Sequence, residues 1–262
     1  MAPIREEPPD SRAPARDPGP DLLRRNLQAV RERIARAARR AGRDPQDATL
    51  VAVTKSVETD IIEHLVSLGA IDLGENRIQV AAPKIERLQS GPTWHLIGHL
   101  QTNKARRAVA LFSWIHAVDS VSLFDRLERA ADDLELRPRV LFQVNVSGEE
   151  SKFGVSVEEL PALLERAAGA KRLQPVGLMT MAPMCDDPEA ARPHFRMLRE
   201  LLLEARNRLS PEFRHLSMGM TNDFEVAVEE GATLVRVGSA LFQVQRQSGD
   251  SPEAARRQPG GD

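Results

Sequence analysis

The chain has 262 residues, a formal net charge of −2, one cysteine and no tyrosine. The near balance of charge gives no overall attraction to nucleic acid, and no apolar run approaches the roughly 20 residues that cross a bilayer. The single cysteine, Cys185, excludes an internal disulfide and a cysteine cluster for zinc, so we expect a reducing, cytoplasmic setting. The absence of tyrosine excludes any chemistry that needs a phenol from this chain.

Both ends of the sequence have the composition of disordered tails. Residues 1–20 are prolines and charged residues with almost nothing apolar, and residues 245–262 are similar. Such segments bury too little surface to offset the entropy of ordering. The first segment also lacks the apolar core of a secretory signal. We therefore expect one folded domain over residues 21–244.

The predicted domain begins with an amphipathic helix over residues 21–41. Its apolar residues recur at the helical period from Leu23 to Ala38, and Gly42 is a natural stop. The other face is rich in arginine. These arginines are Arg24, Arg25, Arg31, Arg33, Arg36, Arg39 and Arg40. A solvated helix face is the ordinary interpretation, and contact with a polyanion is the alternative.

After this helix, short apolar runs alternate with amphipathic segments. The predicted strands are 49–54, 70–73, 94–98, 114–118, 139–145, 173–179, 214–218 and 233–237. The predicted helices between them are 57–68, 76–89, 102–111, 121–136, 156–168, 188–209 and 223–230. Strands joined through helices in this way favour an α/β fold, a single (β/α)8 TIM-like barrel with an extra N-terminal helix. A doubly wound open sheet is the main rival, but no GxGxxG motif follows the first strand.

Two charged side chains on the predicted strands indicate a site, because barrel chemistry lies at the carboxyl ends of the strands. Lys55 ends the first strand; it either extends to solvent or presents an amine that, when neutral, adds to a carbonyl. Arg236 lies within the last strand and needs a partner if it faces the lumen. That partner is either an internal carboxylate or an acceptor on a ligand.

Small polar loops follow the last two strands. Gly238 and Ser239 come after the eighth strand, and the segment from Ser217 through Thr221 to Asp223 follows the seventh. A glycine and a helix start there allow a phosphate to approach free N–H groups, although capped turns are also ordinary loop chemistry. Adjacent loops after strands seven and eight favour phosphate, because barrels frequently bind it there.

Three further polar segments carry weaker signals. Asn76 follows the second strand in a Gly-Glu-Asn-Arg segment that also reads as a helix cap. His95 and His99 are four residues apart, but no acidic third ligand stands at zinc spacing, so we expect no metal site. Residues 147–154 after the fifth strand read either as a plain loop or as a lid over the barrel mouth.

Taken in order, these segments resemble the pyridoxal 5′-phosphate (PLP) homeostasis proteins, single-domain relatives of the N-terminal barrel of alanine racemase. The resemblance covers about residues 22–243. The matching segments are VTK ending at Lys55, GEN ending at Asn76, WHLIGHLQTNK (94–104), NVSGEESKFG (145–154), GLMTM (177–181), SMGMTND (217–223) and RVGSALF (236–242).

The resemblance implies a PLP-binding protein that is not an enzyme and that buffers or delivers the cofactor to PLP-dependent apoenzymes. It implies that Lys55 forms the internal aldimine and that Arg236 faces the pyridine nitrogen. It also implies contacts to the phosphate and lining of the ring pocket. The phosphate residues would be Ser217, Thr221, Gly238 and Ser239, and the ring-pocket residues Asn76 and His95. We expect no nucleic-acid partner, no membrane span and a monomer.

The sequence departs from the family pattern at a few positions. A second lysine and a proline usually follow the aldimine lysine, whereas this chain has Ser56, Val57 and Glu58. That change puts any transfer step through the second lysine in doubt. Gln243 replaces a final glycine, and Arg77 stands where a tyrosine is often found. Thr221 replaces a serine but keeps the hydroxyl.

Two other functions remain as alternatives at this point. A PLP-dependent amino-acid racemase shares the barrel, but two-base racemisation needs a tyrosine from a second domain, and this chain has no tyrosine. A binding or scaffold protein would use the arginine-rich helix to hold nucleic acid or anionic lipid. The complete set of PLP segments favours the cofactor carrier over both.

Overall fold

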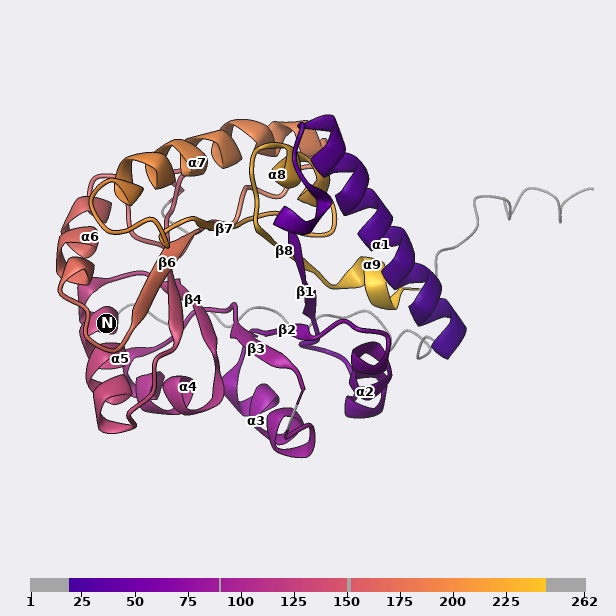
Figure 1. The fold of residues 1–262 in the computed structure, drawn as a ribbon, viewed down its shortest axis with the longest axis horizontal. Coiled ribbons are helices and arrows are strands. Elements are labelled where there is room, and N and C mark those ends of the chain that lie inside the picture. Colours follow the sequence, from indigo (N-terminus) through magenta and orange to yellow (C-terminus); the bar gives the residue numbers. More distant parts are fainter. Residues whose placement is uncertain (1–18, 90, 150–151, 244–262) are drawn as a thin grey trace, which may run out of the picture.

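The computed structural model describes residues 19–243 except residues 90, 150 and 151. Eight parallel strands close in chain order into one barrel, with helices around the outside (Figure 1), which confirms the predicted (β/α)8 fold. The strands are β1 (Thr49–Val53), β2 (Asp72–Glu75), β3 (Thr93–Leu96), β4 (Trp114–Val118), β5 (Arg139–Gln143), β6 (Gln174–Met179), β7 (His215–Ser217) and β8 (Leu234–Val237). The predicted tails lie outside the described residues, apart from Gly19 and Pro20, which begin the first helix.

The helices largely follow the predicted segments. They are α1 (Pro20–Arg40), α2 (Thr59–Ser67), α3 (Ile78–Arg87), α4 (Ala105–Leu111), α5 (Val121–Asp133), α6 (Leu160–Ala168), α7 (Arg192–Arg206), α8 (Phe224–Glu229) and α9 (Ser239–Phe242), with short 3₁₀ turns η1 (Pro45–Asp47), η2 (Thr102–Lys104) and η3 (Pro188–Ala191). No helix in the described part is long and apolar enough to cross a membrane.

Several element bounds differ from the prediction, three of them as follows. The predicted helix over 188–209 is divided into η3 and α7, because the Asp187 side chain caps a separate turn by accepting from the Glu189 N–H. The second strand runs over 72–75 rather than 70–73. Ala70 instead closes the end of α2 through a hydrogen bond to the Leu65 carbonyl, and Ile71 is 48% exposed. Helix α6 begins at Leu160 rather than at 156.

The apolar core has two parts, as expected for a barrel. The larger part lies between the strands and the surrounding helices. A smaller cluster is made of side chains from several strands that pack against one another. Because side chains alternate along a strand, these side chains point into the lumen. The members of this cluster are Val51, Trp114, Ala117, Leu141, Val176, Met179 and Leu234. The lumen is therefore packed, and the polar side chains among these residues need partners of their own.

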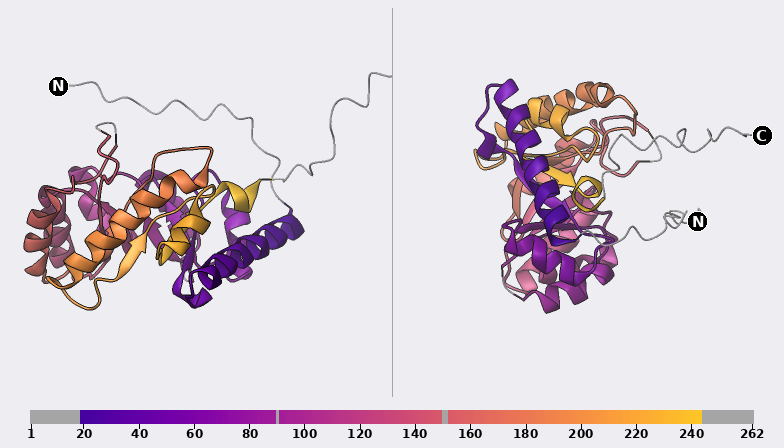
Figure 2. Two further views of the ribbon diagram at one scale, coloured as in Figure 1. Left: turned by 90° about the horizontal axis from the view of Figure 1, so that it is seen from above. Right: turned by 90° about the vertical axis from the view of Figure 1, so that its right-hand side faces the viewer.

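Helix α1 packs against α8 and α9 on the outside of the barrel (Figures 1 and 2). The buried Asn26 amide donates to the carbonyls of Leu241 and Gln243 at the end of α9. Arg33 and Arg40 pair with Glu225 and Glu229 at 3.0 and 2.7 Å. Part of the arginine-rich face therefore fastens α1 to the last helices of the barrel.

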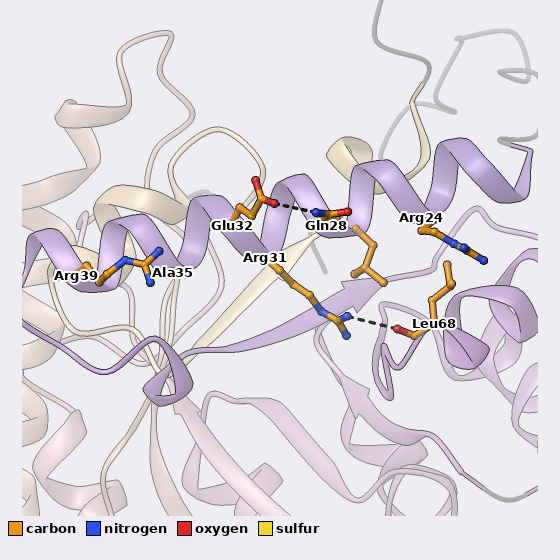
Figure 3. A pocket seen from close by; sticks show the side chains of 8 residues that line it. Arg24, Gln28, Arg31, Glu32, Ala35, Arg39 and Leu68 are labelled. Carbon is orange, nitrogen blue, oxygen red and sulfur yellow. Dashed lines mark hydrogen bonds between the residues drawn. The ribbon is translucent and has the colours of Figure 1, made fainter.

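A groove of about 440 Å³ lies along the other flank of α1 (Figure 3). Arg31 crosses it and donates to the carbonyls of Leu68 and Gly69 after α2. Gln28 and Glu32 form a hydrogen bond on its rim. These contacts tie α1 to α2, so the groove is the boundary between two packed helices. They favour the interpretation of the arginine-rich face as a solvated helix face.

Candidate functional site

Most of the predicted site residues lie around the carboxyl ends of the strands. Lys55 is exposed in the turn after β1, and Asn76 follows β2. Gly98, after β3, is packed against the Asn76 backbone so closely that a side chain at position 98 would collide with it. The ends of β2 and β3 are therefore held together, which fixes the position of Asn76 at the barrel mouth.

The loops after β7 and β8 meet, as the sequence predicted. The Ser239 hydroxyl donates to the Thr221 hydroxyl at 3.0 Å, although the two residues come from different loops. Gly219 has φ of +91°, which disfavours any other residue. Asp223 turns back to accept from the Met220 N–H at 2.6 Å and closes the first loop. The two loops thus present hydroxyls and a glycine-rich backbone at one place on the mouth.

Arg236 is the buried cation of this site. It is only 4% exposed, and it donates to the Ser217 hydroxyl at 2.6 Å and to the Thr180 carbonyl at 2.9 Å. No ion pair to it is found within the described ranges of the chain, so the internal salt bridge considered from the sequence is not made there. Burial lowers the pKa of Arg236 to about 10, and the charge of Asp223 opposes that shift. A guanidinium has five N–H donors, so donors remain for an acceptor on a ligand.

We expect replacement of Arg236 by methionine to destabilise the ligand-free protein slightly. The lowered pKa corresponds to about 3 kcal/mol of unfavourable surroundings for the charge, whereas the two lost hydrogen bonds to this charged group are worth about 1.5–3 kcal/mol each. Urea unfolding of Arg236→Met should show a loss of about 1–2 kcal/mol. A gain of stability would mean that the charge is poorly compensated inside the barrel.

Ser217 and His95 lie inside the lumen and not in the mouth loops. His116 Nδ1 lies 2.9 Å from the Ser217 hydroxyl, and His116 Nε2 lies 3.0 Å from His95 Nδ1. His95 Nε2 in turn lies 3.0 Å from a carboxylate oxygen of Asp72, at the start of β2. Both His95 nitrogens are thus occupied by protein. The structure places Ser217 and His95 below Arg236, and their roles at a phosphate and in a ring pocket stay predictions.

These neighbours stand in a row that the sequence analysis did not detect. Asp72 and His116 were not predicted as site residues. His116 interrupts the apolar run WIHAV (114–118), and a polar residue within such a run indicates a position that faces the lumen. Burial lowers the pKa of His95 and, more strongly, that of His116. For His116 the nearby charges act in the same direction, whereas Asp72 raises the pKa of His95. Both imidazoles are therefore neutral at pH 7.

A second buried group supports the mouth from outside the lumen. Lys84 on α3 donates to Glu75 at 2.8 Å and to the Thr54 carbonyl at 2.7 Å. The Thr54 hydroxyl donates to the same Glu75 oxygen at 2.7 Å. Thr54 precedes Lys55 and Glu75 precedes Asn76, so this cluster holds both site residues in place.

The segment after β5 reaches across to the loop after β3. Phe153 stacks on His99 with ring centroids 4.1 Å apart, and His99 lies 3.2 Å from Asp119. His95 and His99 thus have separate partners. No group of three or more metal-ligating side chains is present in the part of the chain that the structure describes.

Comparison with known proteins agrees with this geometry. The model of the alanine racemase N-terminal domain family matches residues 25–246. A pyridoxal phosphate homeostasis protein of Aquifex aeolicus is 42% identical over 217 residues, which cover 82% of this chain and 95% of the relative. One of Escherichia coli K12 is 38% identical over 228 residues, covering 83% and 94%. The chain belongs to the pyridoxal phosphate homeostasis protein family.

Solved structures place this family member among the same folds. PipY of Synechococcus elongatus, solved with PLP bound, has a TM-score of 0.74 at 34% identity and covers 84% of this chain and 99% of PipY. Alanine racemase of Corynebacterium glutamicum has a TM-score of 0.64 at 15% identity, which shows the shared barrel alone. The match covers 85% of this chain but 60% of that racemase.

Proposed function

We propose that this protein binds PLP at the barrel mouth and acts in PLP homeostasis, without turning over a substrate. The observation that carries the proposal is Arg236, a buried cation below the mouth with donors left for a ligand. Its relatives named for PLP homeostasis support the same assignment. The protein buffers the cofactor or delivers it to PLP-dependent apoenzymes, acting as a monomer.

The residues around Arg236 suit the chemical groups of this cofactor. When bound, PLP supplies an aldehyde that condenses reversibly with a primary amine, and Lys55 presents such an amine in the turn after β1. Thr221, Gly238 and Ser239 supply hydroxyl and backbone N–H donors for the phosphate. Asn76 lines the pocket from the end of β2. Ser217 holds Arg236 from below, and His95 acts on Ser217 through His116.

The same residues argue against an amino-acid racemase. Arg236 keeps its proton at neutral pH because its pKa is about 10, so it donates hydrogen bonds without transferring a proton. The chain has no tyrosine to serve as the second base of a racemase. The likeness to the solved alanine racemase, at 15% identity, shows the shared fold alone. These residues therefore suit a site that binds PLP better than a site that catalyses a reaction with it.

A spectrum and a trapping experiment test the proposal. Purified protein should show a visible absorbance band that borohydride bleaches, and mass mapping should find the reduced adduct on Lys55. Lys55→Ala should lose the band and the adduct. Lys171→Ala, which changes an exposed lysine just before β6, should keep both. A wild-type protein that neither retains nor takes up PLP under native conditions would refute the proposal.

A further inference from the structure

A continuous row of hydrogen bonds crosses the barrel lumen from end to end. It starts at Asp72, the first residue of β2, whose side chain is 24% exposed at the amino ends of the strands. It continues through His95 and His116, which are fully buried. It ends where Ser217 meets Arg236 at the carboxyl ends of β7 and β8. The four links measure 3.0, 3.0, 2.9 and 2.6 Å.

Each link of this row has one possible direction. An ionised carboxylate only accepts hydrogen bonds, so Asp72 requires a proton on His95 Nε2. Burial keeps both imidazoles neutral, so each carries a single proton. His95 Nδ1 is then bare and accepts from His116 Nε2, which leaves His116 Nδ1 bare in its turn. The Ser217 hydroxyl must therefore donate to His116.

At the Arg236 end of the row, this direction decides whether Ser217 presents its proton or a lone pair to the guanidinium. With its proton committed to His116, the Ser217 oxygen turns a lone pair toward the guanidinium, which only donates. In the reverse direction, Ser217 would accept from both His116 and Arg236, and its own buried proton would lack an acceptor. The forward direction is thus the one that satisfies every polar atom of the row.

We infer that Asp72, at the far end of the barrel, is a positioning residue for the cofactor site. It sets the direction of the lumen hydrogen bonds through His95 and His116, so that Ser217 holds the Arg236 guanidinium in one orientation below the mouth. The inference rests on the proposed function for its link to PLP. The direction of the row is a property of the ligand-free protein.

Histidine NMR tests the direction without any ligand. In long-range ¹H–¹⁵N spectra of the ligand-free protein at pH 7, His95 and His116 should each carry the proton on Nε2 and have a bare Nδ1. Asp72→Asn should weaken this preference, because an amide both accepts and donates and so permits the reverse order, which then only the Ser217 proton opposes. A proton on Nδ1 of either imidazole in the wild type would overturn the inference.

Titration with PLP tests the consequence for the site. Asp72→Asn should bind about tenfold more weakly than the wild type, the lower end of the effect seen when the hydrogen-bond partner of a metal ligand is removed. Asp47→Asn is the matched control, because it removes the same charge from an exposed residue at the end of η1, just before β1. The control should bind within about twofold of the wild type.

The outcomes separate the two proposals. A wild type that binds no PLP refutes the proposed function, while the NMR spectra still decide the direction of the row. Wild-type affinity in a folded Asp72→Asn whose imidazoles show a mixture of proton positions would reduce the row to a structural role and overturn the inference. Should Asp72→Asn not fold, Asp72→Ser takes its place, since a hydroxyl also accepts and donates.

Discussion

Replacement of Lys84 by methionine is expected to lower the free energy of unfolding by about 3–5 kcal/mol, because it leaves a buried carboxylate without its cation. Glu75 is fully buried, and its side chain is held by the Lys84 ammonium and the Thr54 hydroxyl on one oxygen. Its other oxygen has no hydrogen-bond partner among the described residues. Urea unfolding at pH 7 measures the loss.

A second substitution separates the buried charge from the lost packing. Adding Glu75→Gln to Lys84→Met removes the carboxylate and should recover at least half of the loss. Arg106→Met is the control, because it breaks an exposed pair with Asp133 and should cost less than about 1 kcal/mol. Equal losses for the single and double variants would assign the effect to packing of the Lys84 stem.

Acid is expected to destabilise the protein well before its carboxylates are protonated. Burial lowers the pKa of His95, His116 and His215 below 6.5, that of His215 to about 4. The unfolded chain therefore binds more protons than the folded chain between about pH 4 and 6.5. The stability is fully present above about pH 6.5 and is lost as the pH falls, with a slope of up to about 1.4 kcal/mol per pH unit for each histidine.

Urea unfolding at several pH values checks this dependence. From pH 7 to pH 5 the free energy of unfolding should fall by about 2–4 kcal/mol. His215→Phe keeps a ring against Trp114, which His215 meets edge to face at 5.2 Å, and should make the slope shallower. A stability that stays flat from pH 7 to pH 5 would show that these imidazoles remain hydrated or change partners in the folded state.

The fold was predictable because its signals are local. Each apolar run of a barrel strand is short, is buried on both faces and is followed by an amphipathic helix, so alternation alone indicates the architecture. The errors were local as well. Ala70 and Ile71 are as apolar as strand residues, yet one ends α2 and the other is exposed, because hydrogen bonding and not hydropathy sets where β2 begins.

The candidate site could be predicted from the sequence where a charged residue interrupts or ends an apolar run. Lys55 and Arg236 stand out in apolar runs, and glycine with hydroxyl residues marks the mouth loops. Hydrogen bonds between side chains on different strands could not be predicted in the same way. Asp72 and His116 are separated by 44 positions yet belong to one row of hydrogen bonds, and only the barrel register brings them together. The same holds for Lys84, which reads as a surface lysine until α3 places it over Glu75.

The packing of α1 against α8 and α9 sets the order in which the chain can complete its structure during synthesis. Helix α1 leaves the ribosome long before its partners, which include Glu225, Glu229 and the carbonyls of Leu241 and Gln243. The ring of strands also closes only when β8 pairs with β1. A nascent chain that stops short of α9 therefore exposes part of the apolar face of α1, and exposed apolar surface of this kind favours aggregation.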